Sequence, residues 1–163
     1  MVWSGYGKTM QRALDQLVTA VAAELMGATA ANAVAISERV LHDLVDHFAV
    51  DVSFLRHNDH AIRATRLIAQ WPPATEEVMQ AIGVVYFSDA DPVFALAETQ
   101  KEPSVFRPEA ATEDYQKTIE AGTAVPQVSM ACVPLVSGDL TTGVLGFIKF
   151  GDREWTEPEL NAL

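Results

Sequence analysis

The segment spanning residues 129–150, SMACVPLVSGDLTTGVLGFIKF, constrains the fold more than any other part of the chain. In residues 129–136 both alternating sets of side chains are apolar, so a strand here would be buried on both faces. Turn-forming residues follow at 137–139, and a second two-sided apolar run spans residues 143–150. The pattern predicts an antiparallel hairpin in a sheet that needs a helical layer on each face, which makes a three-layer sandwich.

A second hairpin is predicted upstream, with strands at residues 50–56 and 61–71 and a polar loop at residues 57–60. This loop would place Asp51 opposite Arg66. Both faces of this hairpin are again apolar. One face is expected to carry Val52, Phe54, Leu67 and Trp71, and the other Leu55, Ile62, Ala64 and Ile68.

Short, irregular elements are predicted between the two hairpins. Helices are expected at residues 75–80, 93–99 and 113–121, and short strands at residues 84–87 and 103–107, because proline, glycine and capping residues divide this region. A layer built from such short pieces would cover one face of the sheet loosely. We therefore expect a pocket between this insert and the sheet.

Helices are predicted before the first hairpin. The helix at residues 33–48 has an apolar face that would pack against the sheet. An earlier helix, within residues 1–31, carries regularly spaced apolar residues at Leu14, Val18, Val21 and Leu25. This spacing suits a signalling helix that pairs with its own copy in a dimer, and equally a helix that folds back on its own domain.

A further helix is predicted to begin at residues 156–159, where Thr-Glu-Pro-Glu forms a capping box. Only a few residues follow, and such a short helix would be marginal in isolation. We therefore expect residues 32–163 to be one domain of a longer protein, with its C-terminal helix truncated.

The formal net charge of −11 argues against two classes of partner. Nucleic acids and anionic membranes attract basic patches, and the sequence has no basic cluster. The single cysteine, Cys132, cannot form an intramolecular disulfide, which favours a reducing cytoplasm. No apolar run approaches the roughly 20 residues of a membrane span, and no signal-peptide pattern begins the chain. The sequence predicts a cytoplasmic protein with neither nucleic-acid nor membrane partners.

Six segments, taken in order, resemble the GAF domain, a small-molecule sensor and dimerisation module. They are DVSFLR at residues 51–56, LIAQW at 67–71, EPSVF at 102–106, SMACVPL at 129–135, GVLGF at 143–147 and WTEPEL at 155–160. The resemblance implies an α/β three-layer sandwich with a central antiparallel sheet and helices on both faces. It also implies a homodimer formed through the terminal helices.

The stretch VVYFSDADPVFALAETQKEPSVFRP resembles the GAF region that precedes GGDEF and EAL domains in some bacterial cyclic-di-GMP signalling proteins. This resemblance implies a regulatory domain that binds a small molecule and modulates an attached diguanylate cyclase or phosphodiesterase. The alternative is a degenerate GAF domain that only dimerises or docks.

Enzymatic chemistry finds little support in the sequence. GAF-type free methionine sulfoxide reductases use several cysteines, whereas this chain has only Cys132, and no nucleophile elbow or phosphate loop is present. His57 and His60 flank Asp59, but turn chemistry alone would select these residues, and no further metal ligand is predicted. We expect no catalytic residues and no metal, while histidine spacing leaves a haem ligand open and the cofactor unknown.

In the GAF family the pocket lies between the sheet and the helical insert. The resemblance predicts these lining residues: Phe54, Trp71, Tyr86, Phe94, Phe106, Tyr115, Ile119, Met130 and Cys132. Large apolar residues at these spacings also form ordinary core, and alternation does not tell which sheet face Met130 and Cys132 share. An apolar or aromatic ligand is favoured over an anionic nucleotide, because few cations are expected near the rim. Those cations are Arg63, Arg66, Lys101, Arg107 and Lys117.

Overall fold

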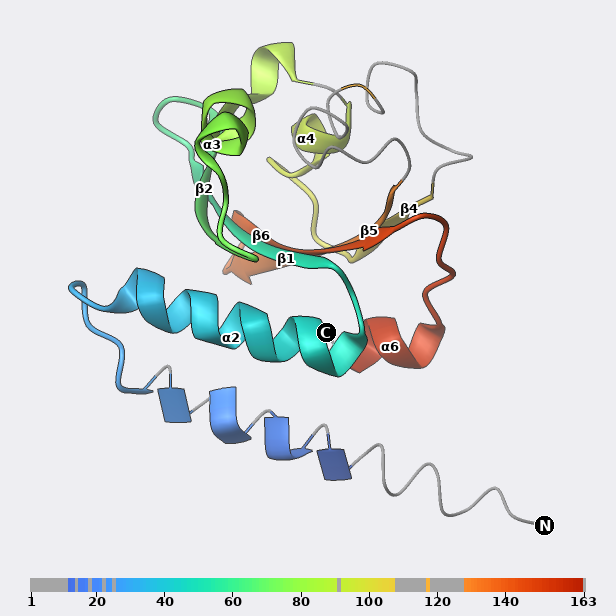
Figure 1. The fold of residues 1–163 in the computed structure, drawn as a ribbon. Helices are drawn as coiled ribbons and strands as arrows, with labels where there is room; N and C mark the ends of the chain where they lie inside the picture. The colour runs from blue at the N-terminus through green and yellow to red at the C-terminus, as the bar shows by residue number, and fades with distance from the viewer. Residues whose placement is uncertain are drawn as a thin grey trace.

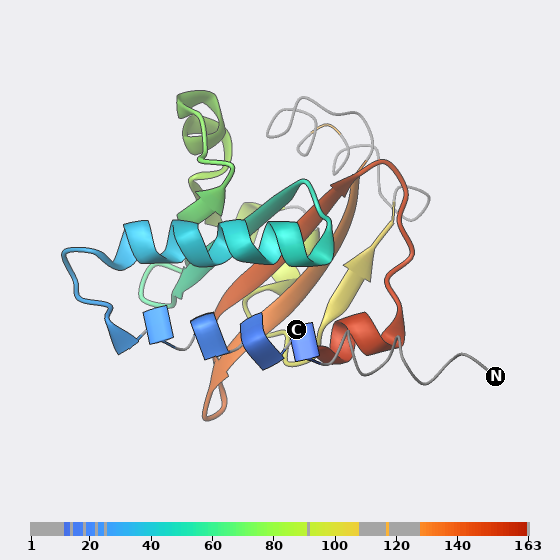
Figure 2. The same ribbon diagram turned by 60° about the horizontal axis from the view of Figure 1, so that its bottom comes forward.

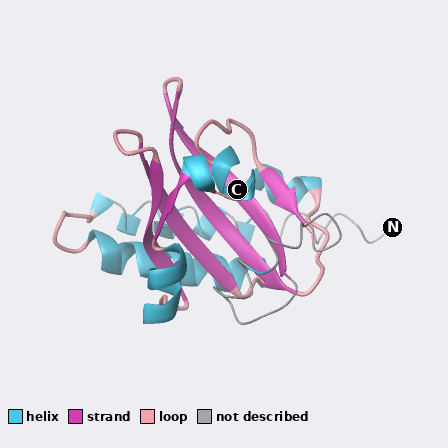
Figure 3. Cartoon of the chain, turned by 90° about the horizontal axis from the view of Figure 1, so that it is seen from above, coloured by secondary structure: helices cyan, strands magenta, loops and turns pink. Residues whose placement is uncertain are grey.

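The computed structural model describes residues 12–13, 15–17, 19–21, 23–24, 26–90, 92–107, 117 and 128–162. These residues form a six-stranded sheet in the order β3-β2-β1-β6-β5-β4, and every neighbouring pair of strands is antiparallel (Figure 1). The strands are β1 (Val52–Asp59), β2 (Ala64–Trp71), β3 (Val84–Tyr86), β4 (Ser104–Phe106), β5 (Val128–Ser137) and β6 (Leu140–Phe150). Seen from above, the long strands lie side by side (Figure 3).

Helices cover both faces of this sheet (Figure 1). On one side lie α2 (Ala33–Phe48) and α6 (Glu157–Ala162). On the other lie α3 (Glu76–Ile82) and α4 (Pro92–Leu96), with the short 3₁₀ turn η1 (Phe87–Asp89) between them in sequence. The predicted three-layer sandwich with a central antiparallel sheet is therefore confirmed. The helix expected at residues 113–121 falls almost wholly outside the described residues.

The described pieces between residues 12 and 26 are helical and lie on the same side of the sheet as α2 (Figure 2). They contact α2 through an ion pair in which Arg39 Nε lies 3.3 Å from Glu24 Oε2. None of the helices in the described ranges is both long enough and apolar enough to cross a bilayer.

Strands β5 and β6 are buried on both faces at residues 128–132 and 143–148, and the two faces belong to separate cores. The core towards α3 and α4 contains Val52, Val128, Met130, Cys132, Val144 and Ile148. The core towards α2 and α6 contains Phe48, Val50, Ala131, Phe147 and Trp155. The two-sided burial expected for residues 129–150 holds for residues 129–132 and 143–148. It fails at the outer end of the hairpin, where Leu135 and Val136 are 37% and 44% exposed. Met130 and Cys132 face the irregular insert.

Arg153 fixes the start of α6 to the end of α2. Its Nη1 donates to the carbonyl oxygen of Phe48 at 2.8 Å, and its Nη2 donates to Glu159 Oε1 at 2.7 Å. The guanidinium carbon lies 4.3 Å from the centroid of the Trp155 ring. The predicted capping box is also present, because Thr156 N–H donates to Glu159 Oε2 at 2.8 Å and Glu159 N–H donates to Thr156 Oγ1 at 3.4 Å.

The first hairpin differs from its predicted register. Asp59 pairs with Ala64, so the turn lies at residues 60–63 and the sequence His57-Asn58-Asp59 continues β1. The strand is extended here because the Asn58 side chain is buried, and its amide donates to the carbonyl oxygens of Ala97 and Thr141 at 2.7 and 3.0 Å. The prediction of a loop at residues 57–60 is wrong, because polar residues suggested a turn. The buried Asn58 side chain instead forms hydrogen bonds to backbone carbonyl oxygens.

Phe147→Ala is expected to lower the free energy of unfolding by about 3–5 kcal/mol, because a fully buried ring would leave a cavity. Phe147 is 0% exposed, and its ring centroid lies 5.5 Å from that of Phe48. Urea denaturation measures this loss. The matched control is Phe150→Ala at the end of the same strand, where the ring is 40% exposed and a clearly smaller loss is expected. Equal losses in the two variants would contradict the two-sided core.

Candidate functional site

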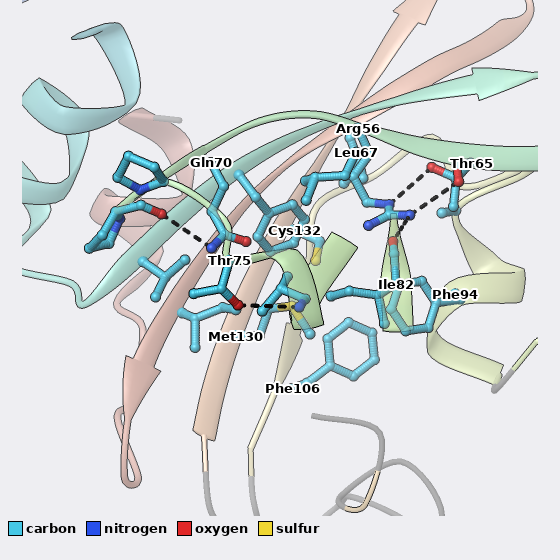
Figure 4. Close-up of a pocket in the computed structure, with 18 of the residues that line it drawn as sticks. Arg56, Thr65, Leu67, Gln70, Thr75, Ile82, Phe94, Phe106, Met130 and Cys132 are labelled. Carbon is cyan, nitrogen blue, oxygen red and sulfur yellow. Dashed lines mark hydrogen bonds between the residues drawn. The ribbon is translucent and has the colours of Figure 1, made fainter. Parts of the chain in front are cut away.

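A cavity of about 200 Å³ lies between the sheet and the α3–α4 insert (Figure 4). Its walls are mostly apolar. The sheet supplies Val52, Phe54, Arg56, Thr65, Leu67, Gln70, Phe106, Met130, Cys132, Val144, Ile148 and Phe150. The insert supplies Pro72, Pro73, Thr75, Val78, Ile82, Phe94, Ala97 and Gln100.

Strand register explains why these sheet residues share one wall. Residues paired directly across neighbouring strands point to the same face. Val52, Ile148 and Met130 are paired across β1, β6 and β5, and they form one row of the wall. Phe54 and Cys132 flank Gly146 in the next row.

Gly146 makes room for the Phe54 ring. A Cβ atom at this position would lie 2.0 Å from Phe54 Cζ, well inside van der Waals contact. Glycine therefore allows the aromatic ring to lie across β6, where it lines the cavity.

A β-bulge decides which β2 side chains face the cavity. The register between β1 and β2 shifts between Leu55 and Arg56, and this shift leaves Ile68 without a direct partner on β1. Beyond the bulge the alternation is reversed, so Gln70 lines the cavity and Trp71 points to the opposite face. There the Trp71 ring packs edge-on against His42 of α2, with 4.7 Å between centroids. The prediction that Trp71 shares a face with Leu67 is therefore wrong.

Arg56 is the one charged side chain among the described residues that line the cavity, and it is 3% exposed. Its Nε donates to Thr65 Oγ1 at 3.2 Å, and its Nη2 donates to the carbonyl oxygens of Thr65 and Ile82 at 3.1 and 2.8 Å (Figure 4). Burial lowers the pKa of Arg56 to about 10, so the guanidinium keeps its charge at neutral pH. The Phe94 ring centroid lies 5.4 Å from its guanidinium carbon.

Cys132 lines the same cavity and is a free, buried thiol. Burial raises the pKa of the Cys132 thiol to about 12, although the nearby Arg56 charge acts in the opposite direction. Because the thiolate is the nucleophilic form, this environment makes Cys132 unreactive at neutral pH.

The predicted lining residues fall into three groups. Phe54, Phe94, Phe106, Met130 and Cys132 line the cavity. Trp71 and Tyr86 lie outside it; Tyr86 is 55% exposed on β3, a strand at the edge of the sheet, so its hydroxyl needs no buried partner. Tyr115 and Ile119 lie outside the described residues. Whether any of these residues contacts a ligand stays a prediction.

The cations expected at the rim do not line the cavity. Arg63 pairs with Glu98 at 2.8 Å, Arg66 with Asp59 at 3.4 Å, and Arg107 with Asp152 at 2.6 Å. Lys101 donates to the carbonyl oxygen of Asp139.

Arg56 was missed as a site residue, although the sequence carries a signal for it. Alternation from Val52 and Phe54 places Arg56 on the same face of β1. An arginine at the third position of an apolar strand face indicates either a strand end or a buried cation, and β1 continues past it to Asp59.

In the first hairpin, His60 contacts the backbone of β6. His60 Nε2 lies 2.8 Å from the carbonyl oxygen of Thr141, next to the Asn58 side chain that contacts the same oxygen. Across the described ranges, no group of three or more His, Cys, Asp or Glu side chains is placed to hold a metal ion.

No family model matches the chain. Two curated relatives, an uncharacterized protein of Mycobacterium tuberculosis and one of Mycobacterium bovis, are each 60% identical to it over 151 residues. Each match covers 92% of this chain and 24% of the relative. The chain therefore spans about a quarter of the length of these curated relatives.

Three solved structures share the arrangement of layers. The GAF domain of an Acinetobacter phosphoenolpyruvate-protein phosphotransferase has a TM-score of 0.64 at 13% identity, covering 94% of this chain and 85% of that one. The phycocyanobilin-bound GAF domain of a cyanobacterial phytochrome has a TM-score of 0.67 at 14% identity, covering 91% and 86%. Free methionine-R-sulfoxide reductase from Neisseria meningitidis, in complex with its substrate, has a TM-score of 0.65 at 18% identity, covering 98% and 84%. These likenesses, together with the antiparallel sheet between helical layers, show that the chain has the fold of GAF domains.

Proposed function

We propose that this chain is a regulatory sensor domain that binds a small molecule in the cavity and modulates an attached catalytic domain. The observation that carries the proposal is the mostly apolar cavity of about 200 Å³ between the sheet and the insert. Apolar walls with a few polar groups are typical of small-molecule sites. Two of the structural neighbours hold small molecules, a bilin in one and a substrate in the other.

The sheet offers a route from the cavity to the terminal helices. Met130 and Cys132 line the cavity, whereas Ala131 between them belongs to the core beneath α2 and α6. A ligand that shifts β5 would therefore shift the surface on which these helices rest. Arg153 joins the ends of the two helices, so they would move together.

The attached domains are proposed from the size of the relatives and from the sequence resemblance. The curated relatives are about four times as long as the matched segment, which leaves room for further domains. The resemblance of residues 84–108 favours GGDEF and EAL domains, and with them a role in cyclic-di-GMP signalling in the cytoplasm. We further propose a homodimer formed through the terminal helices, and no enzymatic activity in this segment itself.

Native mass spectrometry of the freshly purified chain tests the binding proposal. A co-purified metabolite is expected as added mass. Ala97→Leu places a larger side chain in the cavity wall and is expected to abolish the added mass, because the ligand and the new side chain compete for the same space. Ala81→Leu is the matched control, because Ala81 is exposed on α3 and does not line the cavity.

The outcomes of this experiment are distinct. Added mass that survives in Ala97→Leu would place the ligand elsewhere on the molecule. No added mass in the wild-type chain, together with an attached catalytic activity that Ala97→Leu leaves unchanged in the full-length protein, would contradict a sensor role.

Cys132 provides a test of the non-enzymatic assignment. Cys132 is buried, and burial raises the pKa of its thiol, so Ellman's reagent is expected to label the native chain very slowly at pH 8. Labelling should become complete within minutes when the chain is unfolded in urea. Because the folded pKa lies above the ordinary thiol value, native labelling should continue to accelerate at pH values where an ordinary thiol is already fully ionised. Rapid native labelling at pH 8 would reveal an activated thiol and would favour thiol chemistry instead.

A further inference from the structure

Arg56 is a buried cation whose hydrogen bonds leave part of its guanidinium group unused. A guanidinium has five N–H donors. The single Nε donor and the two Nη2 donors bind neutral oxygens of Thr65 and Ile82. The two Nη1 donors make no hydrogen bond to any described residue.

The charge of Arg56 is also unbalanced within the part of the chain that the structure describes. Five other described arginines have carboxylate partners: Arg39 with Glu24, Arg63 with Glu98, Arg66 with Asp59, Arg107 with Asp152, and Arg153 with Glu159. Arg56 is more buried than any of these, yet no described carboxylate lies within ion-pair distance of it. A buried charge without a counter-ion is costly, so this site would gain from an anion.

The surroundings of Arg56 define the rest of the ligand. The Phe94 ring lies beside the guanidinium, and the neighbouring walls come from Phe54, Leu67 and Val144. These side chains suit an apolar or aromatic body. A space of about 200 Å³ limits that body to a small molecule.

We propose that the cavity takes a small apolar or aromatic carboxylate whose carboxyl group binds the free Nη1 side of Arg56, an inference that rests on the proposed function. A monoanion matches one cation, and the free Nη1 N–H groups can donate charge-assisted hydrogen bonds to a carboxylate oxygen. A phosphate carries a second charge, and none of the described lining residues offers a second cation to balance it. The sequence favoured an apolar or aromatic ligand. The proposal adds one anionic group at one end of that ligand.

Isothermal titration calorimetry on the 163-residue chain tests this inference with two probes, 3-phenylpropionate and 3-phenylpropionamide. The probes share one apolar body and differ in the charge of the end group. The carboxylate is expected to bind about tenfold more tightly or better, because charge-assisted hydrogen bonds in a buried site are the stronger ones. Any co-purified molecule is first removed by dialysis, and its absence is checked by native mass spectrometry.

Three variants test whether Arg56 causes the difference in affinity between the carboxylate and the amide. Arg56→Gln is expected to remove the preference for the carboxylate while the amide still binds. Arg56→Lys keeps the charge but loses the guanidinium geometry that anchors this side chain to Thr65 and Ile82, so an intermediate preference is expected. Arg66→Gln is the matched control, because Arg66 lies on the neighbouring strand, is exposed and does not line the cavity. Circular dichroism confirms that each variant is folded.

If Arg56→Gln fails to fold, the affinities of the wild-type chain for the probes still test the inference. Equal affinity for the two probes would overturn the carboxylate assignment and leave the proposed function standing. Tighter binding of 3-phenylpropyl phosphate than of 3-phenylpropionate would also overturn it, in favour of a dianion. If neither probe nor neutral propylbenzene binds, the inference is overturned, because the cavity is then not a site for small aromatic molecules. The proposed function is decided separately, by the native mass spectrometry and the full-length activity of Ala97→Leu.

Discussion

The antiparallel pairing of β1 with β6 at the centre of the sheet is the constraint on which the other features depend. It sets Val52 opposite Ile148 and Arg56 opposite Val144 on the cavity face, and Ser53 opposite Phe147 on the helical face. The two strands approach so closely that a Cβ atom on Gly143 would lie 2.2 Å from the carbonyl oxygen of Arg56. A shift of one residue would exchange the two faces and destroy both cores at once.

The cover of the cavity is fixed to this central pair by polar contacts. The Asn58 amide joins the end of α4 to β6 through the carbonyl oxygens of Ala97 and Thr141, and Thr141 Oγ1 in turn donates to the carbonyl oxygen of Gln100 at 2.8 Å. Arg56 reaches the last residue of α3 through the Ile82 carbonyl oxygen. An irregular layer made of short helices is thus held to the sheet by partly buried hydrogen bonds in addition to its apolar contacts.

The sequence predicted the layers and the second hairpin, because two-sided burial leaves a local pattern that alternation reveals. It did not predict the register of the first hairpin, since the bulge between Leu55 and Arg56 and the burial of Asn58 depend on contacts with residues far away in the chain. For the same reason Trp71 was placed on the cavity wall in error. Phe54, Phe94, Phe106, Met130 and Cys132 could be identified because the resemblance to GAF domains puts the pocket between the sheet and the insert, and these are apolar residues on the elements that enclose it. Arg56 escaped because charge normally signals exposure.

The alternation of β5 has a further consequence for how such a domain would work. Met130 and Cys132 line the cavity, while Ala131, 0% exposed, lies against the opposite core. Consecutive peptide units therefore separate the two compartments, and the partition between them is one strand thick. Under the proposed function, a ligand in the cavity would lie one strand away from the core beneath the helices, and the small side chain of Ala131 brings the β5 backbone itself close to that core.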